Sequence, residues 1–426
     1  MSNHIPWKQQ FIIITTVALT LFFRAGTVDF LFGDDTALFK NAFDNPLHSI
    51  AKPYAGYCQI ICRSLASLFM ALPLDYTVLS FILAPFISTL IVATTILNMS
   101  WLSIGQRKIM ALTTVLIPHS SEVYIYLCNT NWILSILPCL FLLIPNLGSI
   151  RSARTLSIVT TTSILGLSTI YVPILSPLFA IRFLRVKQKN SGEIVFLAAI
   201  ILTSAIQTAV VVVNGLTMSA TNDTIPAFAP HFSPIVTFIN AIFILPVSAY
   251  VTSVELLQKA LHDIRIFIPS ALLVMTMCLG ICYLWMKSDK EVRIRSLLFF
   301  CLGYYLIIAC AVRTIDALQI FIPMRGADRY FYLPYFFFTV ALTQIITFKN
   351  TSFQRKALSC FVVLVLAAFY ISEWHITRAP EGAREVWQQQ VAKLYATGTW
   401  DFNPRNGAYT PTENKDNRAT ETPSIK

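Results

Sequence analysis

Long apolar runs recur along almost the whole chain, and most of them approach the roughly 20 residues that cross a membrane as one helix, although the run at 172–184 is short for a span. Only 12% of the 426 residues are charged, whereas about 25% is usual in a soluble domain. The runs are too many and too long for one buried core. They predict an all-α polytopic membrane protein.

The first run, from Phe11 to Phe23, lacks the small-residue cleavage site of a secretory signal, so we expect a retained helix. About eleven crossings are expected, at residues 10–32, 76–98, 109–126, 131–147, 155–171, 172–184, 194–214, 264–286, 296–315, 329–348 and 357–374. A further apolar run at 234–251 is interpreted as a re-entrant or interfacial helix that Pro246 breaks.

Basic residues gather in short clusters between the apolar runs, such as "RFLRVKQK" at 182–189 and "KSDKEVRIR" at 287–295. This is the distribution of cytoplasmic loops, and it argues against nucleic acid as the partner of a chain with net charge +11. All of the 21 acidic residues except Glu193, Asp289 and Glu291 fall outside the predicted cytoplasmic segments. The topology therefore places the amino end in the cytoplasm, the carboxyl end outside, and the function on the outer face.

Three segments are expected on that outer face. A transmembrane domain, residues 1–374, contains an outer loop at 33–75 and a re-entrant or interfacial region at 215–263. The third segment is a tail at 375–426, which becomes polar and is expected to be disordered toward its end. The cysteines lie mostly within apolar runs and are interpreted as small hydrophobic helix residues.

Two adjacent acids, Asp34 and Asp35, follow the first apolar run and open the outer loop. Two interfacial helices are predicted around them, one through about Phe43 and one that begins at Pro53. A carboxylate at the boundary between water and membrane could act as a general base or a metal ligand. In the alternative interpretation, one aspartate caps a helix and the other is solvated.

Two further outer segments carry polar candidates. The turn "IPHSSEVYIYLCNTNW" places Glu122, Asn129, Asn131 and Trp132 where they could bind a polar head group, or simply form a loop and an aromatic belt. Arginines near the outer face suit bidentate phosphate binding, or they could be snorkelling residues paired with acids; they are Arg24, Arg313, Arg325 and Arg329.

The segments "DDTALFKNAF…PYAGYCQIICR", "SSEVYIYLCNTNW" and "GADRYFYLPY" resemble the GT-C glycosyltransferases, and more narrowly the bacterial and phage glucosyltransferases that modify O-antigen. The resemblance implies that Asp34 or Asp35 is catalytic, with Asp35 preferred, and that Glu122 is a second acidic site residue. Arg325 or Arg329 would hold the lipid phosphate, with Tyr54, Tyr57 and Tyr330 as further binding residues of the same motifs.

The family uses polyprenyl-phosphate sugars, so the resemblance implies transfer of a hexose, such as glucose, to a surface or lipid-linked glycan of lipopolysaccharide at the bacterial inner membrane. The expected partners are this donor, the glycan acceptor and membrane lipids. The acids are adjacent and form no Asp-x-Asp motif, so no cofactor is assigned and a divalent cation stays open. A transporter or flippase of lipid-linked sugars and an O-antigen polymerase or ligase are the alternatives.

Overall fold

The computed structural model describes residues 5–25, 31, 34–53, 56–117, 121–124, 126–218, 264–313, 332–346, 356, 359–360 and 383–397. Every regular element in this part of the chain is a helix, which agrees with the predicted all-α class. The helices are α1 (Trp7–Ala25), α2 (Asp34–Asp44), α3 (Pro46–Ala51), α4 (Ile60–Phe69), α5 (Leu74–Leu97), α6 (Ile104–Thr113), η1 (Ser121–Tyr124), η2 (Leu127–Asn129), α7 (Thr130–Leu134), α8 (Ile136–Phe141), α9 (Ala153–Gly166), α10 (Tyr171–Arg185), α11 (Ser191–Met218), α15 (Ile264–Lys287), α16 (Lys290–Arg313), α17 (Tyr332–Ile346) and α19 (Ala383–Thr397).

Three of the described helices are long and apolar enough to cross a membrane: Tyr76–Leu97, Ser191–Val213 and Lys290–Ala309. They coincide with the expected crossings at 76–98, 194–214 and 296–315. Large apolar side chains such as Ile201, Leu202 and Val213 are exposed along α11. Exposed apolar surface of this extent is costly in water and suits hydrocarbon, so the structure is that of a membrane protein. The run at 234–251 and nearly all of 357–374 lie outside the described residues.

Two expected crossings are not continuous helices. The 109–126 segment is α-helical only to Thr113, where α6 ends, and resumes as the 3-10 helix η1 at Ser121. The carbonyl of Thr114 accepts hydrogen bonds from the hydroxyls of Tyr124 (2.7 Å) and Tyr332 (3.1 Å). Because these two hydroxyls donate to the Thr114 carbonyl, the chain can leave the helix while this buried carbonyl keeps hydrogen-bond partners.

The 131–147 segment divides into two short helices, α7 and α8, at Ser135. Pro138 lies in the first turn of α8 and cannot donate to the carbonyl of Leu134, so the helical hydrogen-bond ladder is interrupted there. At the break itself, the hydroxyl of Ser135 donates to the carbonyl of Asn131 at 2.6 Å.

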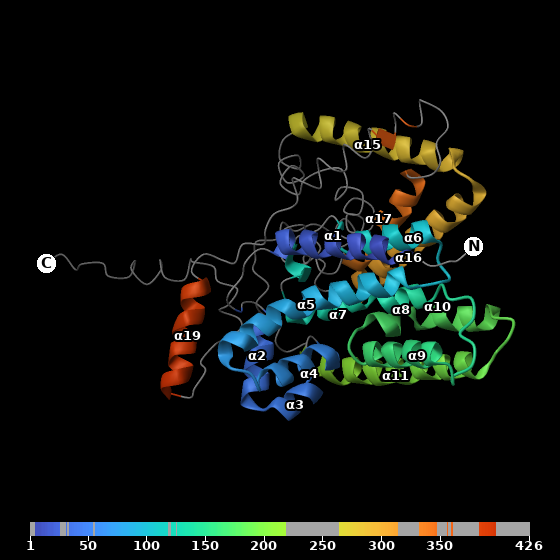
Figure 1. Ribbon diagram of the computed structural model, residues 1–426. Coiled ribbons are helices and arrows are strands. Elements are labelled where there is room, and N and C mark those ends of the chain that lie inside the picture. The colour runs from blue at the N-terminus through green and yellow to red at the C-terminus, as the bar shows by residue number, and fades with distance from the viewer. Residues whose placement is uncertain are drawn as a thin grey trace.

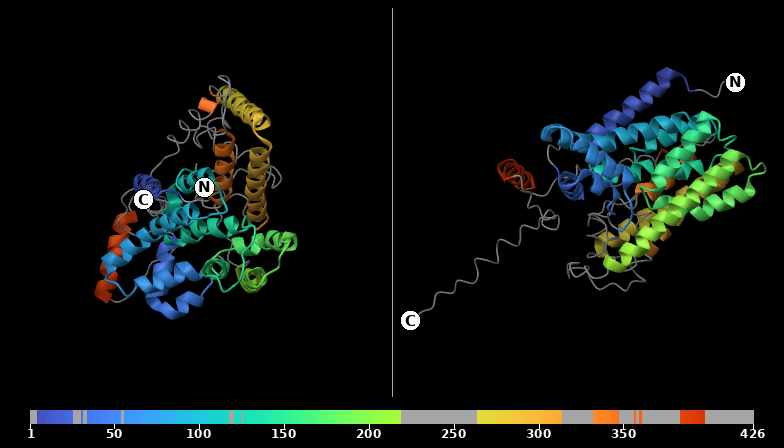
Figure 2. Two further views of the ribbon diagram at one scale, coloured as in Figure 1. Left: turned by 45° about the vertical axis from the view of Figure 1, so that its right-hand side comes forward. Right: turned by 90° about the horizontal axis from the view of Figure 1, so that it is seen from below.

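The helices connect at two opposite ends of the molecule (Figure 1 and Figure 2). The turns α5–α6, α8–α9, α10–α11 and α15–α16 lie together at one end, which we call the loop end. Helices α2, α3, α4 and α19 lie at the other, which we call the first-loop end. The basic clusters at 182–189 and 287–295, both within the described residues, therefore lie at the loop end, away from the acid pair that opens α2.

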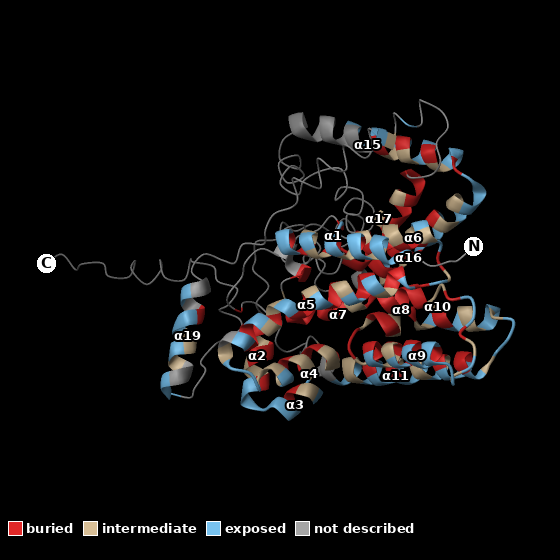
Figure 3. Ribbon diagram, viewed as in Figure 1, coloured by how far each residue is buried: buried red, intermediate tan, exposed pale blue. Residues whose placement is uncertain are grey.

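The buried core lies between these ends and is most continuous along α7, α8 and α17 (Figure 3). Helix α17 packs against α16 through aromatic pairs, for example Tyr304 with Phe338 at 4.9 Å between ring centroids. A Cβ at Gly303 would lie 2.7 Å from the ring of Phe338. The absent side chain is what permits the close approach of α16 and α17.

The first loop contains three helices rather than the two expected, and α4 begins at Ile60 instead of near Pro53. The extra helix α3 forms because the Asn45 side chain accepts from the His48 N–H, with Pro46 in the first turn. Gly56, at φ 81°, then turns the chain away from helix.

The segment before α4 is held by Gln207 on α11. Its Oε1 accepts from the N–H of Cys58 at 2.9 Å, and its Nε2 donates to the Cys58 carbonyl at 3.0 Å. The N–H groups of Ile60 and Ile61 then bond to the carbonyl of Leu167 and the hydroxyl of Ser168. These contacts fix where α4 starts. They also satisfy Gln207, a polar residue within the apolar helix α11.

Part of the predicted tail is ordered on the first loop. In α19, Trp387 is buried and packs edge-on against Phe39 of α2, with ring centroids 5.7 Å apart. The tail helix and the first loop therefore lie at the same end of the molecule (Figure 1).

Candidate active site

Asp35 is the second residue of α2, and α2 directs its side chain into the protein, where it is 1% exposed. Its Oδ2 accepts from the N–H of Leu127 at 2.7 Å and its Oδ1 from the N–H of Cys128 at 3.0 Å. These two donors open the 3-10 turn η2, so the carboxylate caps that turn across 92 residues of sequence. The acid pair and the "CNTNW" segment, predicted separately, are thereby joined.

Cys62 of α4 holds the same turn from its carbonyl side. Its thiol lies 3.1 Å from the carbonyl oxygen of Leu127 and 3.5 Å from that of Cys128. Burial raises the pKa of Cys62, with Asp35 as a smaller contributor, so the sulfur stays protonated and can donate. We call Asp35, Cys62, Leu127 and Cys128 the η2 junction.

The first turn after η2 buries polar side-chain groups that have no hydrogen-bond partner among the residues the structure describes. Asn131 is 2% exposed, and neither its Nδ2 nor its Oδ1 makes a hydrogen bond within the described residues. The hydroxyl of Thr130 is in the same condition in this part of the chain. Burying an unpaired polar group costs roughly 1–3 kcal/mol, so a fold retains one where it has a use. Asn131 therefore has unused donors and acceptors for a ligand.

Three other predicted binding residues are buried, and two of them, Asn129 and Trp132, lie close to Asn131 in the sequence. Asn129 is in η2, and its Oδ1 lies 3.6 Å from the sulfur of Cys128. Trp132 follows Asn131 and packs edge-on against Tyr171, with ring centroids 5.2 Å apart. Tyr57 is also buried. Trp132 thus packs in the protein interior, not in an interfacial belt.

Arg24, at the end of α1, is committed to protein groups. Its Nη1 donates to the carbonyls of Val115 and Ile117, at 2.7 and 3.0 Å. The guanidinium lies 5.0 Å from the ring centroid of Tyr124, within cation–π range. In the structure, Arg24 anchors the irregular segment between α6 and η1; its predicted role toward phosphate stays a prediction.

Sequence reasoning missed Arg63, which is 1% exposed on α4. Its Nη1 donates to the carbonyl of Ser49 at 3.0 Å and its Nη2 to that of Pro53 at 3.2 Å. Arg63, the residue after Cys62, therefore connects α4 to α3 and to the segment that follows α3. Its one sequence signal is an arginine within an otherwise apolar helix, "IICRSLASLF".

The remaining predicted residues are described only in part or not at all. For Asp34 and Glu122 the structure places the backbone, at the start of α2 and in η1. Tyr54, Arg325, Arg329 and Tyr330 lie outside the described residues, and for Arg313 only the backbone is placed. Among the described residues, no group of three His, Cys, Asp or Glu side chains could hold a metal ion.

Compared with protein-family models, curated proteins and solved structures, the chain matches none of them.

Proposed function

We propose that the protein is a GT-C-like glycosyltransferase of the bacterial inner membrane, with about eleven spans and its first-loop end outside the cytoplasm. It would transfer a hexose, such as glucose, from a polyprenyl-phosphate carrier to a cell-surface glycan such as O-antigen. The gathering of the basic clusters at the loop end supports this orientation under the positive-inside rule.

The observation that carries the proposal is Asn131. Its buried amide has no partner within the described part of the chain and follows the η2 junction, which anchors the turn to the helix that begins with the acid pair. A sugar carries hydroxyls that both donate and accept, as a primary amide does. The site therefore suits a hydroxyl-rich ligand presented beside a carboxylate.

Within this proposal the two aspartates have different roles. Both oxygens of Asp35 accept backbone N–H groups of η2, and the side chain is 1% exposed, so this carboxylate is already engaged inside the protein. Asp35 is therefore a positioning residue, contrary to the preference drawn from the sequence. Asp34, its neighbour at the start of α2, is the proposed general base.

The proposed reaction is a direct displacement at the anomeric carbon. Asp34 takes the proton of an acceptor hydroxyl, and the acceptor oxygen forms a bond to the anomeric carbon. The bond from that carbon to the carrier phosphate breaks, and polyprenyl phosphate leaves with the electron pair. Arg325 or Arg329 would bind this phosphate, because a guanidinium pairs with it in bidentate fashion.

Surface-glycan composition tests the proposal. Mass spectrometry of glycan from cells with the protein should show an added hexose that cells without it lack. The Asp34→Asn variant should lose this addition, while Asp44→Asn, a change at the exposed far end of the same helix, should keep it. Identical glycan with and without the protein would contradict the proposed function, and full addition by Asp34→Asn would contradict the role of Asp34.

A further inference from the structure

A groove of about 870 Å³ opens at the loop end, between α10, α16 and residues 142–146, which follow α8. Most of its lining is apolar, and its walls include Leu142, Leu178, Ile181, Leu298 and Leu302. Ile181 and Leu298 are 46% and 49% exposed, so the groove is open along one side. Its shape and lining suit a hydrocarbon chain.

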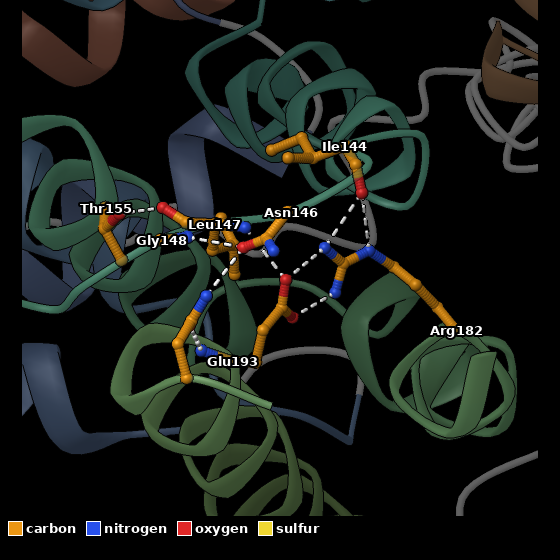
Figure 4. A network of polar contacts seen from close by, with 8 residues as sticks. Ile144, Asn146, Leu147, Gly148, Thr155, Arg182 and Glu193 are labelled. Atoms are coloured by element: carbon orange, nitrogen blue, oxygen red, sulfur yellow. Dashed lines mark hydrogen bonds and ion pairs between the residues drawn. The ribbon is translucent and has the colours of Figure 1, made fainter. Parts of the chain in front are cut away.

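Arg182 lines the groove, and its charge is neutralised by an ion pair with Glu193 (Figure 4). Its Nη1 and Nη2 bond to the carboxylate of Glu193 at 2.6 and 2.9 Å, and its Nε and Nη2 bond to the carbonyl of Ile144 at 3.0 and 2.9 Å. Glu193 also accepts from the N–H of Leu147. Arg182 is therefore a structural clamp and offers no charge to a ligand.

Two other cations of the same lining are uncompensated. Arg185 and Lys187 are exposed, and neither has an ion pair or a hydrogen bond from its side chain within the described part of the chain. Among the described residues that line the groove, none is acidic. The groove thus combines an apolar wall with two free positive charges at one end.

We propose that this groove binds an anionic phospholipid of the cytoplasmic leaflet. One acyl chain would lie along the apolar wall, and the phosphate would pair with Arg185 and Lys187. Basic pockets between membrane helices at the cytoplasmic side are suited to such head groups. The proposal uses the orientation given under the proposed function, but it concerns the opposite end of the molecule from the η2 junction.

The bound lipid would also join α10 to α16. In the described structure these helices share a direct polar contact, in which the hydroxyl of Tyr305 donates to the carbonyl of Ile174. A chain in the groove beside Tyr305 would add apolar contact between the same two helices. Binding should therefore raise the thermal stability of the protein.

The test uses purified full-length protein in detergent, with dioleoyl phosphatidylglycerol, dioleoyl phosphatidylcholine or inorganic phosphate added before native mass spectrometry and thermal melting. We expect phosphatidylglycerol to bind at least fivefold better than phosphatidylcholine and to raise Tm. Equal binding of the two lipids would overturn the proposal. Inorganic phosphate displacing the lipid and reproducing the Tm rise would do so as well, because it would indicate a site for a free anion.

Three variants locate the site. Replacing Arg185 and Lys187 together with alanine should abolish the preference, and Ile181→Trp should weaken lipid binding without changing charge. Replacing Arg151 and Lys290 with alanine removes two exposed cations that do not line the groove, so the preference should survive. Equal loss in this control would indicate general surface charge and refute the groove. Hexose addition should continue in the groove variants, so either proposal can fail alone.

Discussion

Asp35 and Asn131 are both nearly fully buried, yet one is satisfied and the other is not. Asp35 receives two backbone N–H groups, whereas the Asn131 amide has no partner among the described residues. The first pattern is typical of a group that stabilises the fold. The second leaves a donor and an acceptor that a ligand or a water molecule could use.

Replacing Asp35 with alanine should destabilise the protein by about 3 kcal/mol or more, because two hydrogen bonds to a charged group are lost and two buried N–H groups remain. Thermal melting of the purified protein measures this. Asp44→Ala is the control, since that exposed side chain at the other end of α2 should change stability by less than about 0.5 kcal/mol. A Tm for Asp35→Ala equal to that of the control would show that the η2 junction adds nothing to stability.

Asn131→Leu should have the opposite signature. Removing an unpaired buried amide should leave Tm unchanged or raise it, while hexose addition to the glycan should fall at least tenfold. The two readouts are thermal melting and glycan mass spectrometry. If Tm falls together with activity, Asn131 is structural; if activity is unchanged, it does not touch the substrate.

The sequence indicated which polar residues of the outer segments matter, but not which residues they contact in the fold. The acid pair and "CNTNW" stand out because polar residues at the end of apolar runs are costly. That Asp35 binds Leu127 and Cys128 depends on a tertiary contact, which local pattern does not encode. Cys62 and Arg63 were missed for the same reason, since their partners are backbone carbonyls.

At the level of elements, apolar length predicted α5, α11 and α16 well, because a long apolar run has few other folds available. The breaks at Thr114 and Ser135 were not predicted. At the first break the hydroxyls of Tyr124 and Tyr332 both donate to the carbonyl of Thr114, and Tyr332 is more than 200 residues away. The cause of this break is therefore not local.

The clamp of Arg182 and Glu193 connects α10, α11 and the segment that follows α8. Arg182→Met should cost about 3–5 kcal/mol, because it leaves a buried, uncompensated carboxylate. Replacing both residues with methionine should cost less. Thermal melting of the single and double variants tests this order.

The pair Glu291 and Arg295 is the matched control for the clamp. It is an exposed pair one helical turn apart on α16, so Glu291→Ala should change stability by less than about 0.5 kcal/mol. If the double methionine variant is as unstable as Arg182→Met, the cost is lost packing and hydrogen bonding, not an unpaired charge.

At the scale of the whole molecule, the proposed reaction requires the two ends to face opposite sides of the membrane. Cysteines introduced at Lys52 and Lys189, both exposed, mark the first-loop end and the loop end. In intact cells a membrane-impermeant maleimide should label the Lys52→Cys variant and should label Lys189→Cys only after permeabilisation. The reverse pattern would overturn the orientation and with it the proposed mechanism.

The central claim is that sugar moves from a lipid carrier to a glycan, and transfer of label tests it most directly. Purified protein is incubated with polyprenyl-phosphate hexose labelled in the sugar and with glycan from cells that lack the protein. The account predicts labelled glycan and one polyprenyl phosphate released per sugar with the unaltered protein, and neither product with Asp34→Asn. Label that stays on the lipid, whichever side of the membrane it reaches, would contradict transfer and indicate a flippase.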